Sequence, residues 1–265
     1  MIDFLEKFVN IALLKIDYNC NQDCIFCHED WVNKACRKED FLFDNWIDVL
    51  KENNIKSVLL SGGEPFFNYQ KTLGLLRLFK TNNLNTIVIT NGTMLSLSRI
   101  KEIGKLVDLI YLSIHTLNPR NDRRLTGKNF LKTKLINLDL LIRHNIPVIV
   151  RRLVMRDNIL YLNKDLSLFF KNYSTKQNFS IEIGILEIKG QKIKNNFKKF
   201  YLSNNELIKI LNSVLFKFSN KNILLENIPN EILLEKCQNY LDPIVKNIKL
   251  RIELDNQGKY MLEKL

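Results

Sequence analysis

The sequence predicts an α/β fold built on a parallel β-sheet, and three observations indicate it. Short apolar runs alternate along the chain with longer segments whose apolar residues recur at helical spacing. The short runs are continuously apolar, which is typical of strands covered on both faces of a parallel sheet. A chain of 265 residues with 46% hydrophobic content is also long enough for one large domain of this class.

The predicted strands and helices alternate from residue 11 to residue 188. The expected strands are Ile11–Tyr18, Lys56–Ser61, Thr86–Thr90, Leu109–His115, Ile146–Met155 and Phe179–Ile188. Helical spacing predicts helices at Phe41–Asn53, Tyr69–Phe79, Ser96–Leu106, Phe130–His144 and Ile159–Tyr173. Because a helix separates each predicted strand from the next, the strands are expected to run parallel. His144, at the end of one helix, fits a C-terminal capping position.

Individual patterns justify these assignments. The first strand, Ile11–Tyr18, is short and apolar and ends just before a polar, cysteine-rich loop. The second strand contains three consecutive apolar residues, Val58, Leu59 and Leu60. The helix between them has its apolar residues three or four positions apart instead, at Phe43, Trp46, Ile47, Val49 and Leu50.

The net charge of +12 comes from 40 Lys and Arg residues against 28 Asp and Glu residues. The excess favours anionic partners, such as a phosphorylated nucleotide or an acidic peptide, unless it only reflects a composition rich in Lys, Asn and Ile. No run reaches the ~18 apolar residues that a membrane span requires. Residues 1–7 do not resemble a targeting segment. We therefore expect a cytoplasmic protein with reduced cysteines and no membrane partner.

Three cysteines, Cys20, Cys24 and Cys27, form a CxxxCxxC run after the first predicted strand. Three thiolates at this spacing would hold three irons of a 4Fe–4S cluster and leave the fourth iron open to a small molecule. A zinc site that adds His28 fits less well, because adjacent residues rarely point at one metal. Buried metal-free thiols fit less well in so polar a loop, and an odd total of five cysteines argues against disulfides.

Two further motifs follow predicted strands at their carboxyl ends, where barrels of parallel strands collect their sites. After the second strand, Gly62 and Gly63 would let the backbone approach a ligand closely. Glu64 and the exposed carbonyl groups would then hold an ammonium group, and Pro65 would stiffen the turn. The third strand ends in Thr90 and Asn91, next to an Asn-Gly turn signal.

The fourth and fifth strands place polar side chains by alternation. Ser113 and His115 fall on one face of the fourth strand, where His115 would either contact substrate or be structural. Of Arg151 and Arg152, one should point into the barrel and one away from it. We favour Arg151 for the interior because it shares a face with Ile149 and Leu153. A buried arginine needs an anion as its partner.

Phe26 stands just before the third cysteine of the run, and Ser61-Gly62-Gly63-Glu64-Pro65 follows one βα unit later. This combination of motifs resembles the pattern of the radical S-adenosylmethionine (SAM) enzymes. The resemblance implies a partial (βα)6 TIM-like barrel with one 4Fe–4S cluster, whose open iron SAM chelates. It implies that Gly62, Gly63 and Glu64 bind the SAM amino group. It also implies that Ser113 helps to hold the ribose or carboxylate of SAM. By their positions, Thr90 and Asn91 would reach the SAM site, and Arg151 would meet the SAM carboxylate or a substrate phosphate. His115 and Arg152 are candidates for contact with substrate.

Within that family, the stretches Ser113–Pro119, Leu125–Gly127, Val154–Asn158 and Ile181–Gly184 resemble the molybdopterin-pathway GTP cyclase branch. Those enzymes hold GTP on a second cluster, bound by three C-terminal cysteines. Here Cys237 is the only cysteine in the last hundred residues, so we expect one cluster, and the GTP assignment does not carry over from the resemblance. The missing cysteines also argue against peptide maturases with cysteine-rich tails.

Beyond residue 188 we expect an extension, residues 189–265, that closes the barrel or binds a partner. It begins with a basic stretch that would be either a solvated linker or a positive rim over the barrel mouth, containing Lys189, Lys192, Lys194, Lys198 and Lys199. Amphipathic helices are expected at Glu206–Phe218 and Glu231–Tyr240, and a hairpin at Asn247–Leu262 with its turn at Asp255–Gly258.

The sequence therefore predicts an enzyme that cleaves SAM reductively to a 5′-deoxyadenosyl radical, which abstracts hydrogen from a nucleotide-like small molecule. A ribosomal peptide is the competing substrate, and nucleic acid is not expected. A non-enzymatic iron–sulfur protein is a more distant alternative, because it would not explain the Gly-Gly-Glu turn or Ser113. The electron would come from a flavodoxin- or ferredoxin-type protein, whose acidic surface suits a basic partner.

Overall fold

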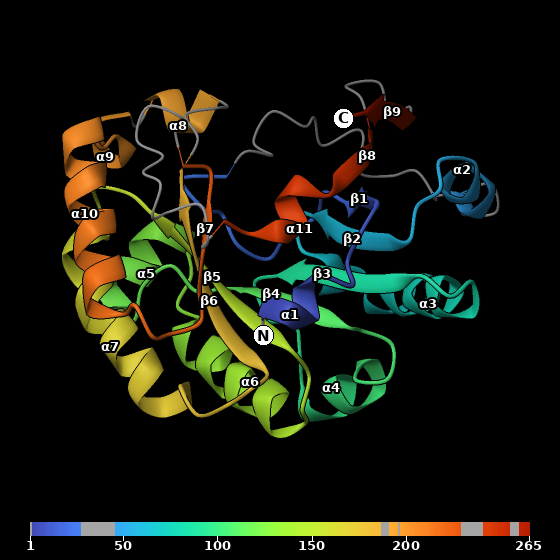
Figure 1. The fold of residues 1–265 in the computed structure, drawn as a ribbon, viewed down its shortest axis with the longest axis horizontal. Helices are drawn as coiled ribbons and strands as arrows, with labels where there is room; N and C mark the ends of the chain where they lie inside the picture. The colour runs from blue at the N-terminus through green and yellow to red at the C-terminus, as the bar shows by residue number, and fades with distance from the viewer. Residues whose placement is uncertain (1, 28–45, 187–190, 196, 229–240, 255–259) are drawn as a thin grey trace.

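The computed structural model describes residues 2–27, 46–186, 191–195, 197–228, 241–254 and 260–265. Its described strands form one sheet in the order β7-β6-β5-β4-β3-β2-β1-β8-β9. Neighbouring strands are parallel except for β8 and β9, which pair antiparallel. Figure 1 shows the sheet curving without closing, with helices along its outer side. The α/β partial barrel is confirmed.

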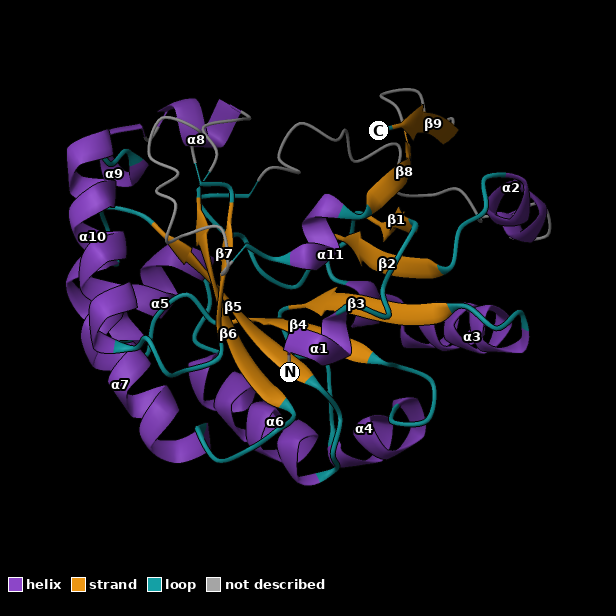
Figure 2. Cartoon of the chain, in the orientation of Figure 1, coloured by secondary structure: helices purple, strands orange, loops and turns teal. Residues whose placement is uncertain are grey.

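The elements alternate along the chain much as predicted (Figure 2). The strands are β1 Ile11–Asp17, β2 Ser57–Gly62, β3 Asn85–Thr90, β4 Leu109–Ser113, β5 Val148–Val154, β6 Phe179–Ile185, β7 Ile223–Glu226, β8 Ile248–Leu254 and β9 Tyr260–Lys264. The helices are α1 Ile2–Leu5, α2 Trp46–Glu52, α3 Tyr69–Thr81, α4 Leu97–Ile103, α5 Pro119–Thr126, α6 Leu131–Arg143, α7 Leu162–Tyr173, α8 Gln191–Asn195, α9 Phe197–Phe200, α10 Asn204–Lys217 and α11 Pro243–Lys246.

All six predicted strands are present, and their ends differ from the prediction by a few residues at most. His144 occupies the C-cap of α6, as predicted. The helix predicted at Glu206–Phe218 is α10, which a capping box of Ser203 and Glu206 starts. Three predicted features lie outside the described residues. They are the first part of the helix predicted at Phe41–Asn53, up to residue 45, the helix predicted at Glu231–Tyr240, and the turn at Asp255–Gly258. Neither α5 nor β7 was predicted.

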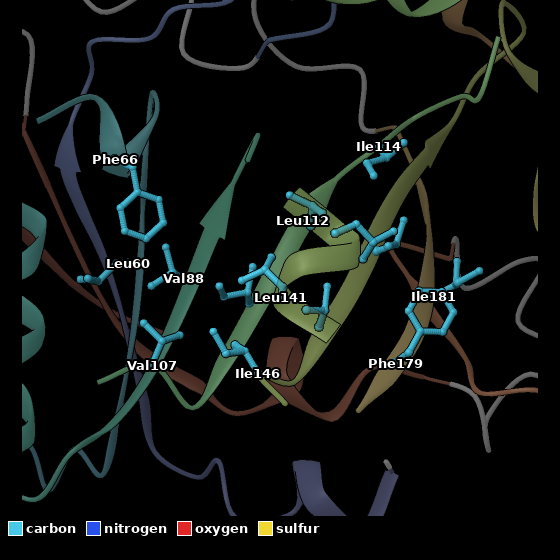
Figure 3. Close-up of a cluster of buried hydrophobic side chains, with 14 of the residues drawn as sticks. Leu60, Phe66, Val88, Val107, Leu112, Ile114, Leu141, Ile146, Phe179 and Ile181 are labelled. Carbon is cyan, nitrogen blue, oxygen red and sulfur yellow. The ribbon is translucent and has the colours of Figure 1, made fainter. Parts of the chain in front are cut away.

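The sheet separates two apolar cores. The larger one lies between the strands and the outer helices, and Figure 3 shows part of it, with Leu60, Val88, Leu112 and Ile181 facing helix residues such as Leu141. The alternate strand residues point inward, where a smaller core closes the amino end of the barrel around Leu5, Phe8, Leu59, Ile87, Tyr111 and Ile149. Polar residues at the carboxyl ends of the strands are therefore left to line the barrel mouth.

The C-terminal residues extend the sheet at both of its edges. β7 pairs with β6, and β8 pairs with β1, so residues after 188 share one sheet with the residues before it. The predicted hairpin is present as β8 and β9. The division of the chain at residue 188 stays a prediction. No helix in the described part of the chain is long and apolar enough to span a membrane.

Candidate functional site

The loop that carries the three cysteines follows β1 and docks on the end of α5. The backbone N–H of Asp23 donates to the Thr126 carbonyl at 3.0 Å, and that of Ile25 donates to the Leu125 carbonyl at 2.9 Å. α5 ends at Gly127, whose φ of +71° is left-handed and whose missing Cβ makes room for Asp23. A helix that the sequence did not predict therefore shapes the cysteine loop.

Cys20, Cys24 and Cys27 all carry free thiols, with Cys20 exposed and the other two partly buried. Burial raises the pKa of Cys24 above its ordinary value, and the positive charge of Lys134 opposes that rise. Charges on Cys27 and Cys20 would raise the pKa of Cys24 further. Three thiolates that repel one another need a cationic centre between them, which an iron cluster supplies.

The donor set fits a cluster better than a single ion. Among the described residues, no three Cys, His, Asp or Glu side chains converge closely enough to hold one metal ion. A 4Fe–4S cube does not require that convergence, because each thiolate binds a different iron. Two N–H groups point at the Cys20 Sγ, from the Gln22 backbone at 3.4 Å and from Asn91 Nδ2 at 3.8 Å. His28, the zinc alternative, lies outside the described residues.

Phe26 anchors the cysteine loop in an apolar cluster. Its ring lies edge-on to the ring of His115, with centroids 4.7 Å apart, in an apolar cluster that includes Leu125, Met155, Leu186, Ile193 and Phe200. Ile193 and Phe200 belong to α8 and α9, which form the described part of the stretch expected to be a linker or a basic rim. That part is therefore helical and packs under the cysteine loop, while Lys194, Lys198 and Lys199 stay exposed.

His115 is buried and held by the backbone of its neighbours. Its Nδ1 accepts the Leu153 N–H at 3.2 Å, and its carbonyl accepts a hydrogen bond from Asn158 Nδ2 at 2.9 Å. Burial holds the pKa of His115 well below its usual range, and the nearby Lys134 lowers it further. The His115 ring is therefore neutral, and it packs edge-on against Phe26. Contact between His115 and substrate stays a prediction.

Gly62 and Gly63 allow two segments of the chain to touch. Gly62 has a φ of +136°, and a Cβ there would strike the Asp17 carbonyl. A Cβ on Gly63 would lie 2.6 Å from the Tyr18 carbonyl oxygen and closer still to that of Asn19. The close approach that the glycines permit is thus between the β2 turn and the entry to the cysteine loop. Their contact with SAM stays a prediction.

Glu64 ties the end of β2 to the end of β3. Its carboxylate is fully buried and accepts hydrogen bonds from Thr90 Oγ1 at 2.6 Å, the Asn91 N–H at 2.7 Å and the Phe66 N–H at 3.1 Å. Burial raises the pKa of Glu64, and these three hydrogen bonds oppose the rise. Thr90 and Glu64 therefore hold each other, in addition to any role toward SAM.

Asn91 connects this network to the cysteine loop. Its Nδ2 donates to Asn21 Oδ1 at 3.0 Å, while its Oδ1 accepts from the Thr93 N–H at 2.9 Å. Asn21 in turn donates to Thr93 Oγ1 at 2.7 Å. Of the predicted SAM residues, Asn91 is thus the one that the structure places directly beside Cys20.

Ser113 and Arg151 face the barrel interior as the alternation predicts, and they are register partners on β4 and β5. The Arg151 Nε lies 2.8 Å from a Glu182 oxygen, and its NH2 group also pairs with Glu226. The two carboxylates outweigh the burial of the guanidinium and raise the pKa of Arg151. The anion that a buried arginine needs is therefore supplied by β6 and β7, which weakens the case for an anionic ligand at this side chain.

Arg152 points to the opposite side of the sheet. It is fully buried, and its guanidinium lies 2.7 Å from the Asp165 carboxylate of α7. The same carboxylate accepts hydrogen bonds from the Leu117 N–H at 2.9 Å and from Thr116 Oγ1 at 3.3 Å. Arg152, a substrate candidate in the sequence prediction, thus packs between the sheet and a helix and is not placed at the barrel mouth.

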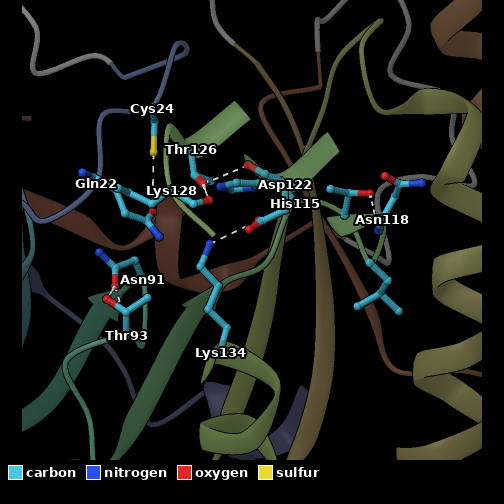
Figure 4. A network of polar contacts seen from close by, with 12 residues as sticks. Gln22, Cys24, Asn91, Thr93, His115, Asn118, Asp122, Thr126, Lys128 and Lys134 are labelled. Carbon is cyan, nitrogen blue, oxygen red and sulfur yellow. Dashed lines mark hydrogen bonds and ion pairs between the residues drawn. The ribbon is translucent and has the colours of Figure 1, made fainter. Parts of the chain in front are cut away.

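One charged residue near the cysteine loop was missed by the sequence prediction. Lys134 lies on α6 with its side chain fully buried, and its Nζ is 3.4 Å from Asp122 Oδ1 on α5 (Figure 4). The available signal was a charge on the apolar stripe of the helix, three residues after Leu131 and four before Leu138. A charge at such a position must be buried or change the helix register.

A family model described as Radical SAM superfamily matches residues 15–164, which is more than half of the chain. The chain therefore belongs to the radical SAM superfamily, a family of enzymes that use SAM and an iron–sulfur cluster. The family assignment supports the motifs from which it was predicted, although it does not by itself assign a role to each residue.

Relatives and structures agree with this placement. A probable GTP 3',8-cyclase of Thermococcus kodakarensis is 25% identical over 163 residues, which are 59% of this chain and 51% of that protein. A probable GTP 3',8-cyclase of Sulfurisphaera tokodaii is 24% identical over 98% of this chain and 82% of its own length. The crystal structure of Streptococcus suis SuiB bound to S-adenosylmethionine has a TM-score of 0.71 at 14% identity, covering 96% of this chain and 60% of SuiB. This chain thus spans about half of the first relative and three fifths of SuiB, whose likeness shows the fold.

Proposed function

We propose that this enzyme holds one 4Fe–4S cluster on Cys20, Cys24 and Cys27 and binds SAM at the open iron. The observation that supports it most is the donor set, three free thiols carried by one loop after β1. When bound, the cluster and SAM together supply a 5′-deoxyadenosyl radical that abstracts hydrogen from the substrate. An external flavodoxin- or ferredoxin-type protein would deliver the electron.

The chain's own residues position these groups. The turn of Gly62, Gly63 and Glu64 would offer backbone carbonyl groups to the SAM amino group, in a shape fixed by the buried Glu64 carboxylate. Ser113, half-buried on the interior face, would hold the ribose or carboxylate of SAM. Arg151 would reach the same carboxylate with the part of its guanidinium that stays exposed to the barrel mouth.

The substrate we propose is a nucleotide- or nucleoside-like small molecule, since a relative that covers 98% of this chain is a probable GTP 3',8-cyclase. The second candidate is a peptide, because SuiB, whose fold covers 96% of this chain, also has a structure with the precursor peptide SuiA bound. The exposed lysines of α8 and α9 would favour an anionic group in either substrate. Because Arg151 is already paired with two glutamates, the anionic preference depends on those surface lysines.

The proposal is tested by anaerobic reconstitution with iron and sulfide, followed by strong reductant and SAM. We expect about four irons per chain and the accumulation of 5′-deoxyadenosine even without substrate. Cys24→Ala should lose both. About eight irons after desalting would show a second cluster, and a wild-type protein that forms a cluster but no 5′-deoxyadenosine would refute the enzymatic proposal. Separate titrations of SAM and of guanosine triphosphate against Arg151→Ala then show which ligand Arg151 serves.

A further inference from the structure

The buried pair of Lys134 and Asp122 lies directly beneath the cysteine loop. Figure 4 shows the lysine rising from α6 toward Asp122, close to Gln22, Cys24 and the end of α5. Both side chains are 1% exposed. Burying two charges costs more than their attraction usually returns, and two apolar side chains would join α5 to α6 at least as well. A purely structural role leaves this cost unexplained.

The geometry of the pair is loose for a structural ion pair. The Nζ–Oδ1 distance of 3.4 Å exceeds the roughly 2.7–2.9 Å of a good charge-assisted hydrogen bond. Asp122 Oδ2 is buried without a hydrogen-bond partner in the described part of the chain. By contrast, the buried pair of Arg152 and Asp165 is 2.7 Å long, and its carboxylate accepts two further hydrogen bonds. Asp122 therefore holds the Lys134 ammonium group in place but compensates its positive charge only in part.

The positive charge of Lys134 reaches the functional groups around the cysteine loop. Thr126, one turn after Asp122 on α5, accepts the Asp23 N–H of the cysteine loop at 3.0 Å and donates to the Asp122 carbonyl at 2.8 Å. The charge of Lys134 also opposes the raised pKa of Glu64 and helps to lower the pKa of His115. The cysteine loop, the β2 turn and the end of β4 therefore all lie within reach of this charge.

We propose that Lys134 is a positioning charge that raises the reduction potential of the cluster on Cys20, Cys24 and Cys27, with Asp122 holding its ammonium group in place. The inference rests on the proposed function. Reduction adds one electron to a cluster that three thiolates already make negative. A fixed cation in a poorly polarisable interior stabilises that added charge, and charge near the cluster is one of the factors that set its potential.

The test is a potentiometric titration of the reconstituted cluster, followed by electron paramagnetic resonance, in wild type and Lys134→Met. Methionine keeps the length of the side chain and removes the charge. At a fixed potential, we expect the ratio of reduced to oxidised cluster to fall at least about tenfold, which equals a shift of 59 mV for a one-electron couple. Lys132→Met removes the same charge from an exposed position on the same helix and should change the ratio less than about twofold.

A second variant guards against misfolding, because Lys134→Met leaves Asp122 buried without its cation. Lys134→Met with Asp122→Asn removes both charges, and it should still show a lower potential than wild type. The inference would be overturned if the ratio of reduced to oxidised cluster in either variant matched that of Lys132→Met. It would also be overturned if both variants lost the cluster, because that result would indicate a structural role for Lys134. Failure of the wild-type protein to bind a cluster would instead refute the proposed function.

Discussion

At the scale of single residues, Gly62 and Gly63 allow two backbone segments to pack closely because they have no side chains. Both lie where the β2 turn meets the backbone of residues 17–19, which leads into the cysteine loop. The Gly63 N–H donates to the Asp17 carbonyl at 2.7 Å and the Glu64 N–H to the Asn19 carbonyl at 2.8 Å. The turn predicted to bind SAM is therefore also the support of the cysteine loop.

Gly63→Ala should disrupt the site, because the added methyl group would overlap backbone carbonyl groups that cannot rotate away. We expect a loss of roughly 1–3 kcal/mol in the free energy of unfolding, together with poorer iron uptake. Gly74→Ala is the matched control, since Gly74 lies exposed in α3 with open space at its Cβ. It should stabilise the protein by roughly 0.5–1 kcal/mol. Urea unfolding of both apoproteins checks the pair, and equal effects would contradict the contact.

His115 should make the apoprotein less stable at mildly acidic pH. Its folded pKa is depressed by burial, so below about pH 6.5 the unfolded chain binds a proton that the folded chain does not. Stability is therefore present above this pH and lost below it, by about 1.4 kcal/mol per pH unit. His115→Gln should flatten the slope between about pH 7.5 and 5.5, since glutamine can still accept the Leu153 N–H. An unchanged slope in His115→Gln would contradict the burial argument.

At the scale of elements, four neighbouring strands contribute to one buried polar network. Arg151 of β5 pairs with Glu182 of β6 and Glu226 of β7, and the Tyr111 hydroxyl of β4 donates to Asp242 at 2.6 Å. Burial raises the pKa of Glu182 well above its ordinary value. The network thus fastens the seventh strand and the segment after it to the barrel interior.

Removal of the cation from this network should be costly. Arg151→Met would leave two buried carboxyl groups without their partner, and we expect a loss of roughly 3–5 kcal/mol in unfolding free energy. Arg143→Met breaks an exposed pair with Asp139 on α6 and should cost less than about 0.5 kcal/mol. Chemical denaturation of the two variants compares them directly. Losses of equal size would mean that the interior network does not stabilise the fold.

Sequence patterns predicted the elements that have a regular apolar period and missed those that do not. The six strands of the core were identifiable because their apolar runs are continuous and separated by helical spacing. β7 has only four residues, Ile223–Glu226, and no motif marks it. α5 is strongly polar, so its role in holding the cysteine loop could not be predicted from an apolar stripe. That Arg151 pairs with Glu226 as well as Glu182 depends on the pairing of β7 with β6, which the sequence does not specify.

At the scale of the whole molecule, the parallel sheet brings the ends of consecutive strands together. Residues far apart in the sequence therefore lie at the same end of the barrel, where the carboxyl ends of the strands gather. Examples are Cys20, Glu64, Asn91 and Ser113. The C-terminal residues add β7 at one edge of the sheet and β8 at the other, so the extension belongs to the frame that carries the site. Cys237 lies outside the described residues, and one cysteine would not hold a second cluster.

The central claim, one cluster with an iron open to SAM, is tested most directly by electron paramagnetic resonance of the reduced, reconstituted protein. Spectra recorded with and without SAM should differ, because coordination of SAM changes the surroundings of one iron while the three thiolates stay in place. The change should saturate as SAM is added. A spectrum that stays the same at saturating SAM, in a protein that contains about four irons per chain, would contradict the account.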